Sequence, residues 1–140
     1  MEVTTIDLLV DLHKALAHPA RVRILAMLRD GELCVCQLNA VIGVAPSTIS
    51  AHLAELREAR LVAERKTGRW VHYRLAAEGA ADTTLAALWR ALEKDATIAR
   101  DRAVLQRIMA LPVEAICRPD FDPSALRDAC SPPATAKRRA

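Results

Sequence analysis

The sequence predicts a mainly α-helical domain that carries one small β-hairpin, and three observations support this fold class. The 140-residue chain is dominated by alanine and leucine and is only 3% aromatic, a composition that favours helices packed on helices. Apolar residues recur at helical spacing along most of the first 60 residues. Residues 61–75 instead alternate between apolar and polar, as paired strands do. Two short helices followed by a hairpin form a winged helix-turn-helix, an arrangement that reads DNA.

The overall composition indicates one folded domain with a tail. The chain is 52% hydrophobic and 26% charged, which is typical of a globular protein. Residues 1–7 are acidic where a signal peptide needs basic residues. No apolar run approaches the roughly 18 residues that span a bilayer. We therefore expect a cytoplasmic protein with no membrane association, in which the four cysteines are reduced thiols.

Two helices are expected within the first 30 residues. The first covers residues 4–17, and a second begins at Pro19, because proline suits the first turn of a helix and disfavours helix in the residue before it. The second helix is expected to end near Arg29, where an Asp-Gly pair follows. We expect Arg21 and Arg23 to lie on its solvent face.

A helix-turn-helix is expected next. A short third helix covers Cys36–Ile42, Gly43 supplies the permissive turn, and Pro46 begins a fourth helix. The buried stripe of this fourth helix follows the spacing i, i+4 and i+7 and consists of Ile49, Leu53 and Leu56.

The opposite face of the fourth helix is the candidate DNA-reading surface. Its N-terminal half is small and polar, which lets backbone and hydroxyl groups approach a DNA groove closely. The candidate DNA-binding residues of this helix are Ser47, Thr48, Ser50, Ala51, His52 and Arg57. His52 lies at the edge of this face, where packing is its alternative role. The alternative for the whole face is an ordinary surface helix with a Ser/Thr-rich first turn.

Residues 61–75 predict a two-stranded hairpin with its turn at Thr67-Gly68. Arg65, Lys66 and Arg69 cluster at its tip and are candidate DNA-binding residues. Between residues 43 and 75, six lysines and arginines stand against three acidic residues, a surplus equal to the net charge of +3 of the whole chain. A charge run is usually only a solvated face. A basic hairpin beside a reading helix, however, suits contacts with phosphate groups.

Residues 80–110 are expected to be helical, which is more helix than a four-helix core needs. Leu85, Leu88 and Leu92 recur at i, i+3 and i+7 and, with Leu9, are the candidate dimer interface. The alternative is that these leucines cover the core of their own chain.

The remaining chain divides from the main domain near Pro112. Residues 118–140 contain four prolines and end in a basic run, Lys137–Arg139, so they predict a loosely ordered tail. We therefore expect a DNA-binding and dimerisation domain over residues 1–110 and a partly disordered C-terminal extension over residues 111–140.

A Cys-x-Cys pair, Cys34 and Cys36, stands at the start of the third helix. Paired thiolates bind soft metals. Residues two apart point about 200° apart in a helix but share a face in an extended segment. We therefore expect a bound ion to unwind or re-aim the start of the third helix, which supports the reading helix.

Other site chemistry finds little support in the sequence. The four histidines, at positions 13, 18, 52 and 72, have no metal-ligand spacing. No phosphate or oxyanion loop precedes either cysteine, so neither an enzyme nor an organic cofactor is indicated. A structural DNA binder with an incidental Cys-x-Cys pair is one further class.

These segments resemble the ArsR/SmtB family of winged-helix repressors. The matching stretches are LAHPARVRIL at 16–25, ELCVCQL at 32–38, STISAHL at 47–53, LREARLV at 56–62 and GRWVHYRL at 68–75, and the similarity covers about residues 5–95. The resemblance implies a homodimer that binds double-stranded operator DNA, represses an operon and leaves the DNA when an inducer binds.

The ELCVC stretch resembles the third-helix site of the arsenic- and antimony-responsive members, which implies As(III) or Sb(III) as the inducer and Cys34 and Cys36 as ligands. A third cysteine that such members often carry three residues later is Asn39 here, and the Ser-Gln that precedes their reading helix is Ala45-Pro46. Residues 80–110 contain no histidine, so the fifth-helix zinc site of the zinc sensors is not expected.

The third ligand for trivalent arsenic, which prefers three thiolates, has two candidates. Cys117 is preferred because Val113 and Ile116 can anchor its segment to the body, whereas Cys130 sits among tail prolines. Three alternatives stay open: Cys117 is simply a buried apolar residue, two thiolates form a site selective for organoarsenicals, or the chain is a thiol-based redox sensor in which Cys34 or Cys36 pairs with a distal cysteine.

Overall fold

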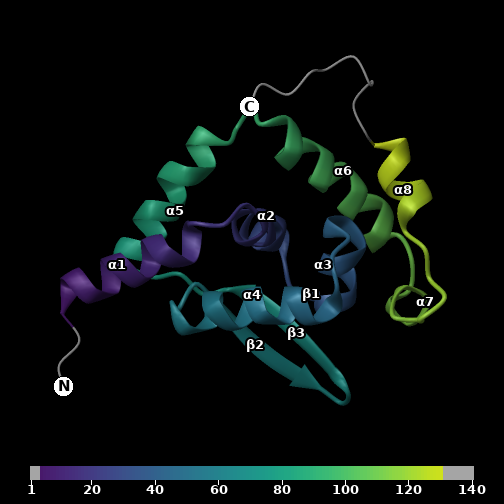
Figure 1. The fold of residues 1–140 in the computed structure, drawn as a ribbon, viewed down its shortest axis with the longest axis horizontal. Coiled ribbons are helices and arrows are strands. Elements are labelled where there is room, and N and C mark those ends of the chain that lie inside the picture. The colour runs from purple at the N-terminus through teal and green to yellow at the C-terminus, as the bar shows by residue number, and fades with distance from the viewer. Residues whose placement is uncertain (1–3, 131–140) are drawn as a thin grey trace.

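The computed structural model describes residues 4–130, and a bundle of helices with a short sheet at one side makes up this part of the chain (Figure 1). The elements are α1 (Thr5–Leu16), α2 (Pro19–Met27), the 3-10 helix η1 (Leu28–Asp30), β1 (Leu33–Cys34), α3 (Val35–Ile42), α4 (Pro46–Glu58), β2 (Val62–Thr67), β3 (Trp70–Leu75), α5 (Ala80–Ala91), α6 (Ala96–Met109), α7 (Val113–Ile116) and α8 (Ser124–Ala129).

The first two helices begin at the local signals expected of them. The Thr4 side chain accepts a hydrogen bond from the backbone of Asp7, and the Asp7 carboxylate bonds back to Thr4, so a capping box starts α1. Nδ1 of His18 accepts a hydrogen bond from the N–H of Ala20 at 3.1 Å, and Pro19 opens α2. The predicted break between these helices is confirmed.

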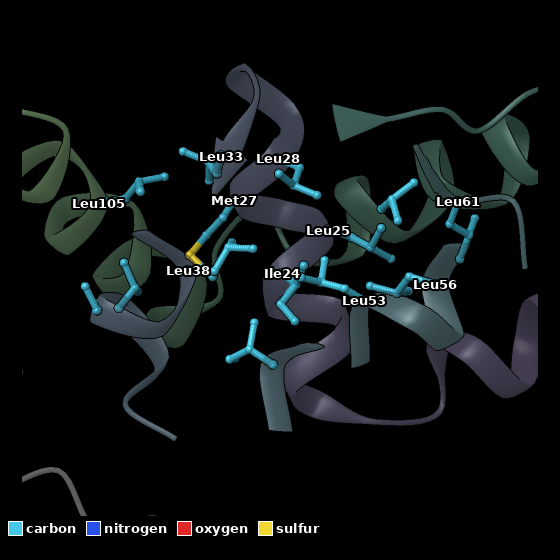
Figure 2. Packing of buried hydrophobic residues seen from close by; sticks show 14 of the residues in the cluster. Ile24, Leu25, Met27, Leu28, Leu33, Leu38, Leu53, Leu56, Leu61 and Leu105 are labelled. Carbon is cyan, nitrogen blue, oxygen red and sulfur yellow. The ribbon is translucent and has the colours of Figure 1, made fainter. Parts of the chain in front are cut away.

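The core forms where α2, α3 and α4 pack together. Ile49, Leu53 and Leu56 of α4 are each 0% exposed, so the predicted buried stripe is confirmed. Figure 2 shows Leu53 and Leu56 beside Ile24 and Leu25 of α2. This packing leaves the opposite face of α4 exposed.

The sheet contains one strand more than the sequence predicted. The strand order is β1-β3-β2, and β1 pairs antiparallel with β3, with Cys34 opposite His72. A strand of two residues carries no periodic pattern, so it could not be seen in the sequence. Thr67 pairs with Trp70, which moves the hairpin loop by one residue to Gly68 and Arg69. Gly68 has a φ of +60°, a conformation that glycine adopts readily.

The long helical region after the sheet divides into α5 and α6. The Asp95 side chain accepts a hydrogen bond from the N–H of Ile98 at 3.0 Å and starts α6. Leu85 is 2% exposed and belongs to the core of its own chain, whereas Leu88 and Leu92 are half-buried and Leu9 is 36% exposed. The core alternative therefore holds for Leu85, and dimerisation through the other three leucines stays a prediction.

None of the helices described is both long and apolar enough to cross a membrane.

Arg23 does not lie free on the solvent face of α2, and that expectation was wrong. Its guanidinium donates to both carboxylate oxygens of Asp101 in α6, at 2.7 and 2.8 Å, and Asp101 is 1% exposed. The hydrogen bond to Asp101 raises the pKa of Arg23 above its usual value. This pair joins residues 78 positions apart, a contact that no local pattern reveals.

The C-terminal extension contains two short helices up to Cys130. Residues 113–116 and 124–129 form α7 and α8, and Phe121 and Leu126 pack against the core. α7 contacts α3, and α8 contacts α6 (Figure 1). The last ten residues, with the Lys137–Arg139 run, lie outside the described part.

We expect Asp101→Ala to lower the free energy of unfolding by about 3 kcal/mol or more, because it leaves the Arg23 guanidinium partly buried without its carboxylate. Chemical denaturation measures this loss. The double variant Arg23→Met with Asp101→Leu should recover most of it, since an apolar pair of similar volume removes the unpaired charge. A single variant as stable as the wild type would contradict this account.

Candidate functional site

Three cysteines from separate segments meet beside the first turn of α3. Cys34 ends β1, Cys36 lies in α3 and Cys117 follows α7. Their Sγ atoms all lie within 4.8 Å of one another. Three thiols at this spacing form a donor set for one soft ion.

Cys34 is held by a hydrogen-bonded cap that the sequence analysis missed. Its Sγ accepts a hydrogen bond from the backbone N–H of Gln37, and its own N–H donates to Oε1 of Gln37 at 2.9 Å. Nε2 of Gln37 donates to Sδ of Met109 at 3.3 Å, which ties the cap to α6. The signal available in the sequence was a glutamine three residues after the residue that starts the helix.

The sulfur atoms meet while α3 stays helical. Cys34 precedes the helix with φ −93° and ψ 166°, an extended conformation, so only Cys36 lies within the first turn. The geometric objection to two ligands inside one helical turn therefore does not apply. The expected unwinding of α3 is not needed to bring the thiols together.

Cys36 and Cys117 are in covalent contact as a disulfide, across a Cα–Cα distance of 5.3 Å. Ile116, only 4% exposed, anchors the residue beside Cys117 in the core. Cys34 is a free thiol, 3% exposed, whereas Cys36 and Cys117 are half-buried and can be approached from solvent. The site can thus hold either three thiol ligands or one disulfide and a free thiol.

Cys130, the second candidate for the third ligand, does not join this cluster. It caps α8 and packs partly against the core. Within residues 4–130, the three-cysteine cluster is the only group of at least three His, Cys, Asp or Glu side chains close enough to share an ion. No histidine belongs to it.

The candidate DNA-reading residues of α4 are mostly exposed. Ser47, Thr48, Ser50, Ala51 and Arg57 all lie at the surface. His52 is half-buried, and its ring centroid lies 4.4 Å from that of His18. His52 therefore packs against the start of α2, in line with the packing role given as its alternative.

Arg65 and Arg69 of the wing, which is the β2–β3 hairpin, and Arg57 of α4 have intramolecular partners. Arg65 forms an ion pair with Glu32 at 3.1 Å and donates to Oγ1 of Thr67 at 2.6 Å, while Arg57 pairs with Glu64 at 2.9 Å. The Arg69 guanidinium lies over the ring of Trp70. Exposed ion pairs of this kind contribute about 0–1 kcal/mol, so phosphate groups can replace these carboxylates at little cost.

The described residues form a winged helix-turn-helix with a cluster of three thiols beside the helix that supports α4. Residues 18–64 match the profile of the bacterial regulatory protein, arsR family. The chain is also 37% identical to HlyU from Vibrio cholerae N16961, a structure that it matches with a TM-score of 0.57 over 64% of this chain and 96% of that one. The chain therefore belongs to the arsR family.

Two relatives carry names that concern arsenic. The arsenic resistance transcriptional regulator ArsR1 of Pseudomonas putida is 48% identical over 63 residues, which cover 44% of this chain and 49% of that protein. The arsenical resistance operon repressor of Escherichia coli K12 is 48% identical over 67 residues, which cover 47% of this chain and 57% of that protein. This chain thus spans about half the length of these two relatives.

We expect the stability of the fold to decrease as the pH falls below about 6.5, the usual pKa of histidine, in part because of His52. Burial lowers the pKa of His52, His18 and Arg21 lower it further, and Glu55 acts in the opposite direction. The unfolded chain consequently binds a proton that the folded chain does not. Thermal denaturation should show a weaker pH dependence for His52→Gln than for the wild type. An equal pH dependence in the two proteins would exclude this role of His52.

Proposed function

We propose that this chain is a homodimeric, cytoplasmic transcriptional repressor that binds operator DNA and is released when trivalent arsenic or antimony binds Cys34, Cys36 and Cys117. The observation that carries the proposal is the convergence of three Sγ atoms within 4.8 Å at the helix that supports the reading helix. The names of the arsenic-resistance relatives favour the same inducer.

The chemistry of the cluster suits trivalent arsenic. Arsenous acid has three hydroxyl groups, and each thiol that binds arsenic supplies the proton with which one hydroxyl leaves as water. Three thiols therefore give one trithiolate complex and three waters, with no change in oxidation state. Soft thiolates prefer such an ion to the hard cations that oxygen ligands bind.

Coupling to DNA has a short path. α3 carries Cys36, is preceded directly by Cys34, and packs against α4, whose exposed first turn holds Ser47, Thr48 and Ser50. A ligand that shifts α3 therefore acts on the support of the reading helix. To act as a switch, the ligand must bind the released state more tightly, typically by 1–3 kcal/mol or about 5- to 150-fold.

A thiol-based redox sensor of the same fold is the second candidate function, and the Cys36–Cys117 disulfide favours it. Their Cα separation of 5.3 Å lies inside the usual range for disulfides of about 4.4–6.8 Å. With hydrogen peroxide as oxidant, two thiols give one disulfide and two waters. In this version Cys34 plays no part.

A site selective for organoarsenicals is a narrower version of the first proposal. An organic substituent on arsenic leaves two exchangeable positions, which two thiols fill. The inducer preference then depends on whether two or all three cysteines are needed.

We expect arsenite to release a fluorescently labelled operator from the wild type, as fluorescence anisotropy measures, and to fail with Cys34→Ser, Cys36→Ser or Cys117→Ser. Cys130→Ser is the matched control and should respond as the wild type does. Separate titrations with methylarsenite, zinc and peroxide rank the inducers. A response to methylarsenite that survives one of the three substitutions would indicate the two-thiol site.

Two results would redirect the proposal. Release by peroxide alone, lost in Cys36→Ser and Cys117→Ser but kept in Cys34→Ser, would identify the redox sensor. If no reagent changes operator binding, the proposed inducers are wrong, and only the DNA-binding function remains.

We expect Lys66→Ala and Arg69→Ala to weaken DNA binding to a similar degree for all sequences, because the wing tip contacts phosphate groups. Each lost phosphate contact should reduce the slope of log K against log salt concentration by about 0.9. Arg107→Ala, at an exposed position on α6 and outside both α4 and the wing, is the control and should keep the wild-type slope. An unchanged slope in the wing variants would place the wing away from DNA.

A further inference from the structure

The C-terminal extension contacts both ends of α3. Cys117 meets Cys36 in the first turn. At the other end, Gly43 caps the last turn with a φ of +76°, and its N–H donates to the carbonyl of Asn39 at 2.7 Å. The Arg127 guanidinium of α8 lies so close to Gly43 that a Cβ there would collide with it. Glycine at this position therefore provides both a left-handed backbone and the space for an arginine.

The end of α3 is a favourable place for a guanidinium. The last carbonyl groups of a helix lack partners within it and carry partial negative charge. Arginine offers five donors in a rigid fork. Asp122 faces Arg127 from within the extension: hydrogen bonds from Ser124 lower the pKa of Asp122, and the charge of Arg127 contributes in the same direction.

The extension is attached to the body of the protein on both sides of an exposed stretch. Ile116, directly before Cys117, is 4% exposed, and α7 contacts α3. Residues 118–120 are exposed, whereas Phe121 and Leu126 are half-buried against the core and α8 contacts α6 (Figure 1). Ten positions of chain therefore connect Cys117 to Arg127, with a core contact on each side of the exposed stretch.

We propose that Arg127 is a positioning residue that couples the state of the thiol site to the turn between α3 and α4. A bond between Cys36 and Cys117, direct or through an ion, fixes α7 to the first turn of α3. Arg127 holds α8 at the last turn, and only Val44 and Ala45 lie between Gly43 and the start of α4 at Pro46. The inference rests on the proposed function, because it assigns the route by which the thiols act on the reading helix.

The test compares the full-length wild type with Arg127→Ala, Arg127→Lys and the control Arg118→Ala. The control removes one positive charge from the same extension at an exposed side chain that pairs with Asp120. For each protein, arsenite affinity follows from the ultraviolet absorption of the sulfur–arsenic bonds. Operator affinity is measured with and without arsenite, and with and without diamide, which oxidises thiols to disulfides. For each reagent, the coupling factor is the operator affinity without the reagent divided by the operator affinity with it.

We expect a wild-type coupling factor in the typical range of about 5- to 150-fold. Arg127→Ala should bind arsenite and free operator as the wild type does, while its coupling factor approaches one. Arg127→Lys should give an intermediate value, because an ammonium keeps the charge but not the fork. Arg118→Ala should match the wild type. A wild-type coupling factor in Arg127→Ala overturns the inference.

Hydrogen–deuterium exchange without DNA separates this inference from the proposed function. If neither arsenite nor diamide releases the wild type, the proposed function fails, and the exchange of amides at residues 42–45 then decides about Arg127. Two results together support the coupling. Amides 42–45 exchange faster in Arg127→Ala than in Arg118→Ala, and diamide changes their exchange in the wild type but not in Arg127→Ala. Equal exchange in the two variants overturns the inference, whatever the operator affinities are.

Discussion

The burial of α3 is the constraint on which the rest of the structure depends. This helix has eight residues, and isolated helices shorter than about 12–15 residues are marginal in water. It exists because Leu38 and Val41, 0% and 1% exposed, pack into the core, each burial contributing about 1.5–3 kcal/mol. A helix stabilised only by its neighbours changes when any neighbour moves. In the proposed function, where α3 lies between the thiol cluster and the reading helix, this dependence is the basis of the switch.

Local signals in the sequence were sufficient for most of the fold. Pro19, Gly43 and Pro46 fix helix boundaries because each restricts or frees the backbone at its own position. The stripe of Ile49, Leu53 and Leu56 fixes which face of α4 is buried, and the alternation from residue 61 onward identifies the two strands of the hairpin. These effects act within a few residues, so they can be inferred without knowing the tertiary structure.

The features that the sequence did not reveal depend on distant partners. β1 is a strand only because it pairs with β3. Arg23 is partly buried because its guanidinium pairs with Asp101 of α6. The candidate site shows the same division. The Cys-x-Cys pair and the preference for Cys117 came from local chemistry and anchoring residues, whereas the extended backbone at Cys34 and its cap by Gln37 follow from the packing of the strand and of α6.

The pairing of Cys34 with His72 also bears on how such a protein can change during evolution. Directly opposite residues of an antiparallel pair lie about 5 Å apart, so one thiol shares a backbone ladder with the wing. In the proposed function, position 34 therefore belongs both to the thiol cluster and to the sheet that carries the β2–β3 hairpin. Cys117, by contrast, follows α7 and forms no part of the sheet. A change of thiol ligand at Cys117 consequently leaves the strand pairing untouched, whereas a change at Cys34 alters a residue of a strand.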